Sequence, residues 1–139
     1  MTAHHVHRYV AETFILIAVS LALAVPGGMR AQQMPQAIAL VLGDYAFSPA
    51  HLEVTVGTPV TLTLTNKDAI TPHNFTLQDK SAGLDIDTDV GAGASRVVEF
   101  TPRAAGTYTF YCNKKLPFMK SHRERGMQGT LTVKQASPD

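Results

Sequence analysis

Four side chains of the sequence are candidate metal ligands: His73, Cys112, His122 and Met127. Together they offer two imidazoles, one thiol and one thioether. Soft sulfur ligands favour Cu(I), whereas imidazole also suits Cu(II). The set therefore predicts a site for one copper ion that cycles between two oxidation states.

Cys112 is the only cysteine of the chain, so it cannot form a disulfide bond within that chain. On its own it indicates a buried spectator, an intermolecular link, or a reactive or metal-binding thiol. Zinc is the main alternative metal, but structural zinc sites more often use several cysteines and do not use methionine. Single histidines and methionines are more often ordinary surface or core residues, so the prediction depends on the four together. His51 has no matching context and is expected on the surface.

Alternation of apolar and polar residues predicts that strands position these side chains. The clearest example is residues 60–65, where valine and leucine alternate with threonine. Residues 78–94 are expected to form a long irregular loop. Within them, residues 85–89 have the opening spacing of a calcium loop but lack its glycine and glutamate, which predicts a solvated loop. About seven short strands separated by turns predict an all-β sandwich. The other predicted strands lie near residues 38–42, 52–56, 73–77, 97–100, 107–112 and 129–133.

The predicted strands bring the candidate ligands to one end of this sandwich. Strand side chains alternate between two faces, so residues of equal parity share a face. By this rule His73 begins an inward apolar row, Cys112 ends a second and Met127 precedes a third. His122 lies in the loop between two of these rows, so we expect a pocket that is dry on one side and capped by loops. The rows consist of Phe75 and Leu77, of Tyr108 and Phe110, and of Leu131 and Val133.

The residues around the candidate ligands resemble a known family. Residues 111–112, residues 122–133 (HRERGMQGTLTV) and the upstream residues 72–75 (PHNF) are similar to the plastocyanin/azurin group of blue-copper cupredoxins. Residues 45–49 and 60–66 also resemble the first strands of that group. The similarity covers nearly all of residues 37–134.

This resemblance implies a Greek-key β-sandwich that holds one copper ion. In the family pattern His73, Cys112 and His122 correspond to the equatorial ligands and Met127 to the axial ligand. Asn74 corresponds to the residue that ties the two ligand loops together by hydrogen bonds.

The loop between Cys112 and His122 departs from the family pattern. It contains nine residues, 113–121, where the best-known members have fewer, whereas the spacing from His122 to Met127 is the family's own. The longer loop leaves open how exposed His122 is and what reduction potential the site has. It also contains Met119 as an alternative axial ligand, although glycines on both sides of Met127 favour the latter.

The implied function is a one-electron carrier between redox protein partners, without enzymatic activity. The sequence shows no catalytic triad, phosphate loop or paired carboxylates in a matching context. A formal net charge of +1 gives no indication of nucleic-acid binding, and we expect a monomer without a small-molecule substrate. Two alternatives are a copper-handling protein of the same fold, which delivers or buffers the metal, and a metal-free sandwich that acts as an interaction module.

Basic residues are concentrated around the second candidate histidine. One interpretation is a docking patch that steers an acidic redox partner toward His122. The other is a solvated loop whose charges specify nothing. Against a single acidic residue, Glu124, the five cations are Lys114, Lys115, Lys120, Arg123 and Arg125.

The N-terminal segment has the features of an export signal. Its apolar run, residues 14–25, falls short of the roughly 20 residues that span a membrane but fits a signal peptide. We therefore expect a signal peptide over residues 1–31, a leader over 32–36, the domain over 37–134 and a polar tail over 135–139. Cleavage after Ala24 and a retained anchor are the alternatives. The predicted location is the periplasm or another compartment outside the cytoplasm.

Overall fold

The computed structural model describes residues 34–137. The predicted signal peptide, the first two residues of the leader and the last two of the tail lie outside the described residues. Within residues 34–137, no helix has the length and apolar character needed to cross a lipid bilayer.

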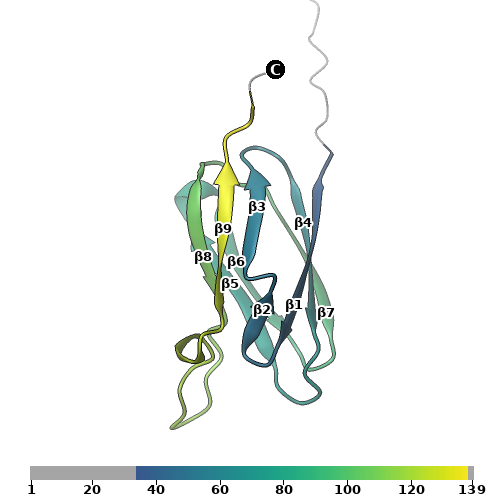
Figure 1. The fold of residues 1–139 in the computed structure, drawn as a ribbon, viewed down its shortest axis with the longest axis vertical. Helices are drawn as coiled ribbons and strands as arrows, with labels where there is room; N and C mark the ends of the chain where they lie inside the picture. The colour runs from purple at the N-terminus through teal and green to yellow at the C-terminus, as the bar shows by residue number, and fades with distance from the viewer. Residues whose placement is uncertain (1–33, 138–139) are drawn as a thin grey trace, which may run out of the picture. The chain divides into compact units, whose positions relative to one another are not determined.

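The described residues form nine strands in two sheets (Figure 1). The first sheet has the order β2 (Ala46–Ser48), β1 (Gln36–Gly43), β4 (Val60–Asn66) and β7 (Ser95–Phe100). The second has the order β3 (His51–Thr55), β9 (Gln128–Lys134), β8 (Gly106–Tyr111), β5 (His73–Asp79) and β6 (Leu84–Val90). Two short 3₁₀ turns, η1 (Lys80–Ala82) and η2 (Arg123–Arg125), complete the described elements.

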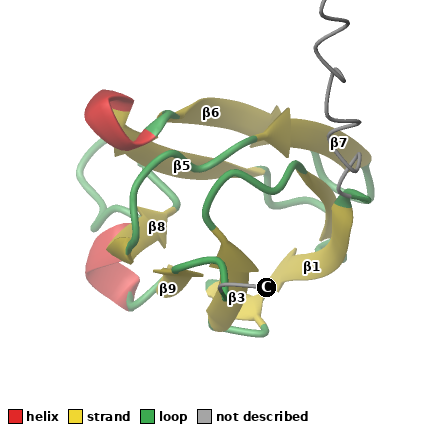
Figure 2. Cartoon of the chain, turned by 90° about the horizontal axis from the view of Figure 1, so that it is seen from above, coloured by secondary structure: helices red, strands yellow, loops and turns green. Residues whose placement is uncertain are grey.

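Neighbouring strands in these sheets are often distant in the sequence. β1 pairs with β4 and β3 pairs with β9, both in parallel, and the other pairs are antiparallel. Figure 2 shows, looking along the strands, that the two sheets face each other around a common interior. This architecture confirms the predicted all-β, Greek-key sandwich.

The core lies between the two sheets and follows the period of two read from the sequence. Along β4, buried apolar residues alternate with half-buried threonines, as the sequence predicts. Phe47, Phe75 and Phe110 meet at its centre, with the ring of Phe110 5.1 Å from that of Phe47 and 5.2 Å from that of Phe75. Full burial stabilises the fold by about 1.5–3 kcal/mol for each such side chain.

The prediction of a long irregular loop over residues 78–94 is wrong. This segment contains η1 and strand β6, and residues 85–89 are part of that strand rather than a solvated loop. Leu84, Ile86 and Val90 are buried in the core, while the intervening aspartates are on the exposed face of the strand. Apolar and polar residues do alternate in this part of the sequence. However, its polar residues are aspartates and one threonine, a composition that is also typical of a charged loop. The three-residue strand β2 was also missed.

Three strand ends meet at one pole of the sandwich. β5 begins and β8 ends at the same pole, because the two strands are antiparallel neighbours. β9 also begins there, since it is antiparallel to β8. In Figure 1 the long connection from β8 to β9 lies at the lower end of the ribbon, beyond these three strand ends. This pole therefore holds all four candidate ligands.

Candidate metal centre

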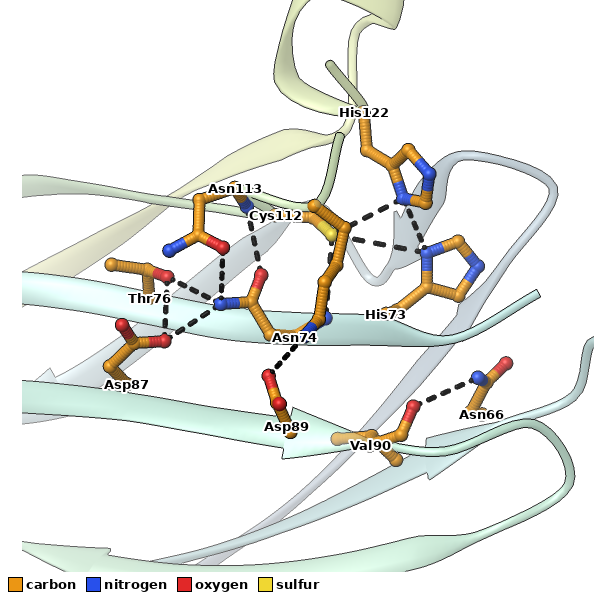
Figure 3. Close-up of polar contacts among 11 residues, drawn as sticks. Asn66, His73, Asn74, Thr76, Asp87, Asp89, Val90, Cys112, Asn113 and His122 are labelled. Carbon is orange, nitrogen blue, oxygen red and sulfur yellow. Dashed lines mark hydrogen bonds and ion pairs between the residues drawn. The ribbon is translucent and has the colours of Figure 1, made fainter. Parts of the chain in front are cut away.

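Three donor atoms meet at this pole of the sandwich (Figure 3). The Sγ atom of Cys112 lies 3.4 Å from Nδ1 of His122 and 3.9 Å from Nδ1 of His73. The two Nδ1 atoms are 3.0 Å apart. Cys112 and His73 are fully buried and His122 is 7% exposed. The structure thus brings together three residues that are separated by up to 49 positions in the sequence.

The spacing of these atoms fits a metal ion. A triangle with edges of 3.0, 3.4 and 3.9 Å encloses a point about 2 Å from each corner, and protein ligands bind metals through nitrogen or sulfur at about 2.0–2.3 Å. One thiolate and two imidazoles in trigonal arrangement are the donors of blue-copper sites. The residues present therefore suit copper in both number and chemistry.

Met127 adjoins this triangle through its backbone. Its N–H donates to the carbonyl of His122 at 3.0 Å, and its carbonyl accepts from the N–H of Cys112 at 3.1 Å. The Met127 side chain is fully buried, whereas that of Met119 is 45% exposed. A thioether must reach the buried donors to act as a ligand, so burial favours Met127 over Met119.

The longer ligand loop folds back toward the centre and leaves His122 buried. The N–H of His122 donates to the carbonyl of Lys114 at 2.8 Å, which closes the inserted segment. Ser121 and Glu124 exchange hydrogen bonds across the turn in the manner of a capping box. The turn η2 is followed by Gly126, whose φ of 101° is rarely adopted by residues with a side chain.

Asn74 connects the two ligand segments. Its backbone N–H donates to Sγ of Cys112 at 3.3 Å, and its side-chain carbonyl accepts from the N–H of Asn113 at 2.8 Å. The side-chain amide donates to the Asn113 side chain at 2.9 Å and to Asp87 at 2.7 Å. These are the bonds between ligand loops that the resemblance implied for this residue.

The profile of the cupredoxin-like domain family matches residues 13–133. The chain belongs to this family. It is 30% identical over 99 residues to plastocyanin of Solanum tuberosum, across 66% of this chain and 90% of that protein. Among solved structures it is similar to auracyanin A, a "blue" copper protein of Chloroflexus aurantiacus, with 28% identity, a TM-score of 0.57 and coverage of 73% and 100% of the two chains. For auracyanin B the identity is 25% and the TM-score 0.58, over 73% and 91%.

Burial sets the ionisation of the donors in the cupredoxin. Removal from water raises the pKa of the Cys112 thiol, and the N–H of Asn74 only partly opposes that shift. Burial also lowers the pKa of the His122 imidazolium, with further lowering from His73 and Arg125. The imidazole of His122 is therefore neutral at neutral pH, as a metal ligand must be. The thiol needs a nearby cation to become the thiolate that binds metal.

Two residues near the centre were missed by the sequence analysis. Asp68, which the sequence analysis did not single out, places Oδ2 2.8 Å from Nε2 of His73. The hydrogen bond from His73 lowers the pKa of this carboxyl group. The ring of Tyr45 meets that of His122 edge to face at 4.8 Å, and Arg125 lies over Tyr45 at 4.5 Å.

Neither residue lies next to a candidate ligand in the sequence. Their contacts depend on how the turns that follow β1 and β4 fold back over this pole, which alternation of apolar and polar residues does not report. His51, by contrast, is exposed as expected and pairs with Thr130 at 2.7 Å.

Proposed function

We propose that the cupredoxin is an exported, monomeric electron carrier rather than an enzyme. In this proposal His73, Cys112 and His122 are the equatorial ligands of one copper ion and Met127 is the axial ligand. The observation that supports it most is the buried triangle of one sulfur and two nitrogen atoms with edges of 3.0–3.9 Å. Bound copper supplies a couple, Cu(I)/Cu(II), that gains and loses single electrons.

The protein's own contribution is to fix the positions of the proposed ligands and to exclude water from them. His73 is the first residue of β5, and Cys112 directly follows β8, so the sheet fixes both backbones. Cys112, His73 and Met127 are fully buried, which excludes water from the inner side of the site. Ligands that barely move between oxidation states lower the cost of electron transfer.

His122 is the proposed exit for electrons, because it is the ligand nearest the surface. It lines an apolar pocket together with Ile70, Pro72 and Leu116. Ile70 is 89% exposed and Leu116 is 61% exposed, so an apolar surface surrounds this edge of the centre. A redox protein that docks here would come close to the His122 ring.

The basic residues near this surface support a partner with an acidic face, but they are not equivalent. Arg123 and Arg125 stack on the rings of Tyr111 and Tyr45 at 4.1 and 4.5 Å. Lys114 pairs with Asp89 at 2.7 Å. Stacking on a neutral ring leaves the charge of each arginine in place, whereas the ion pair offsets that of Lys114. Lys115, Lys120, Arg123 and Arg125 therefore all contribute to long-range steering, and both lysines are exposed.

The proposal is tested by expressing the full chain in a Gram-negative host and purifying the exported protein. N-terminal sequencing is expected to begin at Gln32, which follows the predicted cleavage site. Added Cu(II) is expected to give an intense visible thiolate-to-copper band that His51→Ala retains and Cys112→Ser lacks. A colourless protein that binds Zn(II) as tightly as copper would contradict electron transfer.

The same preparation separates a carrier from a copper-handling protein. A carrier keeps its metal, and the full burial of Cys112 and Met127 favours slow release. Incubation with a mild chelator is expected to remove copper over hours, whereas loss within seconds would favour delivery or buffering.

A further inference from the structure

The imidazole of His73 is contacted at both of its nitrogen atoms. Nδ1 faces the Cys112 sulfur at 3.9 Å and Nδ1 of His122 at 3.0 Å. Figure 3 shows the second ring nitrogen pointing away from the sulfur. That nitrogen, Nε2, lies 2.8 Å from Oδ2 of Asp68, whose side chain is 19% exposed. A partly buried carboxylate therefore lies directly behind a proposed ligand.

Asp68 is held in this position from several directions. Its other carboxylate oxygen accepts from the backbone N–H of Asp44 at 3.1 Å. Its own backbone N–H donates to the side chain of Asn66 at 2.9 Å, and its carbonyl accepts from Gly93 at 3.0 Å. Asn66 is buried and also donates to the carbonyls of Thr71 and Val90, at 2.9 and 3.1 Å. The turn after β4 thus fixes the carboxylate before any metal binds.

The end of β1 leaves room for this carboxylate. A methyl group at Gly43 would approach Oδ1 of Asp68 to 3.0 Å, closer than most real contacts of that kind. A side chain at position 43 would therefore push this carboxylate aside by a few tenths of an ångström.

We propose that Asp68 is a positioning residue of the metal centre that fixes the tautomer of His73 and favours Cu(II) over Cu(I). A carboxylate only accepts hydrogen bonds, so Nε2 carries the proton and Nδ1 presents its lone pair to the metal. A carboxylate behind a metal-bound histidine also makes that ligand more basic. A neutral acceptor would orient the ring equally well, but it would add no negative charge to stabilise the more positive copper ion.

The inference about oxidation state rests on the proposed copper site, whereas the inference about the tautomer does not.

Asp68→Asn removes the charge and keeps the size of the side chain, and its amide can both donate and accept. Asp44→Asn is the matched control: it removes a neighbouring charge but keeps the backbone N–H that binds Asp68. The φ of Asp44 is 50°, and asparagine tolerates this conformation well.

The first measurement uses metal-free protein and the ¹⁵N chemical shifts of the His73 ring. In the wild type and in Asp44→Asn we expect a single tautomer with the proton on Nε2, and in Asp68→Asn a mixture. A proton on Nδ1 of the wild type would overturn the inference even if the protein never bound copper.

The second measurement uses copper-loaded protein. Changes of this kind typically weaken metal binding by about 10–100-fold. We expect that loss for Cu(II) in Asp68→Asn and a smaller one for Cu(I), with the reduction potential rising by about 59 mV for each tenfold difference. A potential equal to that of Asp44→Asn would overturn the inference. If Asp68→Asn does not fold, Gly43→Ala displaces the carboxylate without removing it, and a rise in potential of the same sign is expected.

If the wild type binds no copper, the proposed function fails, and the ring shifts of the metal-free protein still decide the role of Asp68. If the wild type is blue and both aspartate variants have its potential, only the present inference fails.

Discussion

Asn74 and Asn113 hold each other by two reciprocal hydrogen bonds. The backbone N–H of Asn113 donates to the side-chain carbonyl of Asn74 at 2.8 Å, and the Asn74 amide donates back to the Asn113 side chain at 2.9 Å. One residue follows His73 in β5, and the other follows Cys112 at the end of β8. The registered pairing of β5 with β8 is at Thr76 and Tyr111, short of the two proposed ligands. The asparagine pair therefore fixes the separation of His73 and Cys112 beyond that point.

Replacing Asn74 by alanine is expected to destabilise the metal-free protein by about 2–4 kcal/mol, because several polar groups around this buried side chain lose their partner. Urea unfolding of the purified variants measures this effect. Asn113→Ala is the matched control and should cost less, because the backbone N–H of residue 113 still binds Asn74. Equal losses in the two variants would show that the Asn74 amide has no special role.

The two candidate thioethers give a second prediction. Met127→Leu conserves volume and should cost less than about 1.5 kcal/mol in stability. It should retain the visible band but raise the reduction potential, because the axial ligand tunes the potential and loss of a donor destabilises Cu(II) more than Cu(I). Met119→Leu, at a side chain that is 45% exposed, should leave the potential unchanged. The reverse pattern in cyclic voltammetry would make Met119 the axial ligand.

The sequence predicted most of what depends on local alternation. The buried rows that contain Phe75, Phe110 and Leu131 could be predicted because period-two patterns report which side of a strand faces a core. The same rule placed His73 and Cys112 at one end of the fold. It failed for β6, where acidic residues at every second position obscured the apolar ones.

The environment of the site was less predictable. Asp68 reaches His73 only because Asn66 and Gly93 close the turn after β4, and both contacts are side-chain or loop hydrogen bonds without a period. Tyr45 reaches His122 from the turn that follows β1. Sequence alternation reports neither, since it describes the faces of strands and not the return path of loops.

A third prediction concerns pH and the turn η1, at the end of β5 opposite to the proposed ligand His73. Hydrogen bonds from the Ser81 hydroxyl at 2.6 Å and the Ala82 N–H at 3.1 Å lower the pKa of Asp79 below its ordinary value. A carboxyl group whose pKa is lower in the folded state stabilises the protein above the unfolded pKa and loses that effect as the pH falls through the folded value. The stability of the wild type relative to Asp79→Asn should therefore be constant above about pH 5 and decline below about pH 4.

Urea midpoints of the metal-free proteins between pH 2.5 and 7 measure this difference. Ser81→Ala removes the main cause of the lowered pKa, so it should make the decline smaller and end it at a higher pH, while the onset, set by the unfolded chain, stays the same. A difference between wild type and Asp79→Asn that does not change with pH would contradict the prediction.

The fourth prediction separates the two interpretations of the basic loop without knowledge of the partner. Electron self-exchange requires two copies to approach through their His122 edges, where Lys115 lines the pocket and Lys120 is two residues from His122. Like charges repel, so the self-exchange rate of the wild type should rise with ionic strength as salt screens charges beyond about 10 Å at 0.1 M. Neutralising both lysines with glutamine should raise the rate at low salt and flatten its dependence on ionic strength. The rate is measured by NMR line broadening in mixtures of oxidised and reduced protein.

Lys80→Gln carries the same type of change at the opposite end of β5 from His73 and should leave the rate unchanged. If the double variant keeps the salt dependence of the wild type, the lysines are solvated charges without a role in docking. Charges that attract an acidic partner to this edge must also repel a second copy of the protein there, so they must affect the rate of both encounters, with opposite sign.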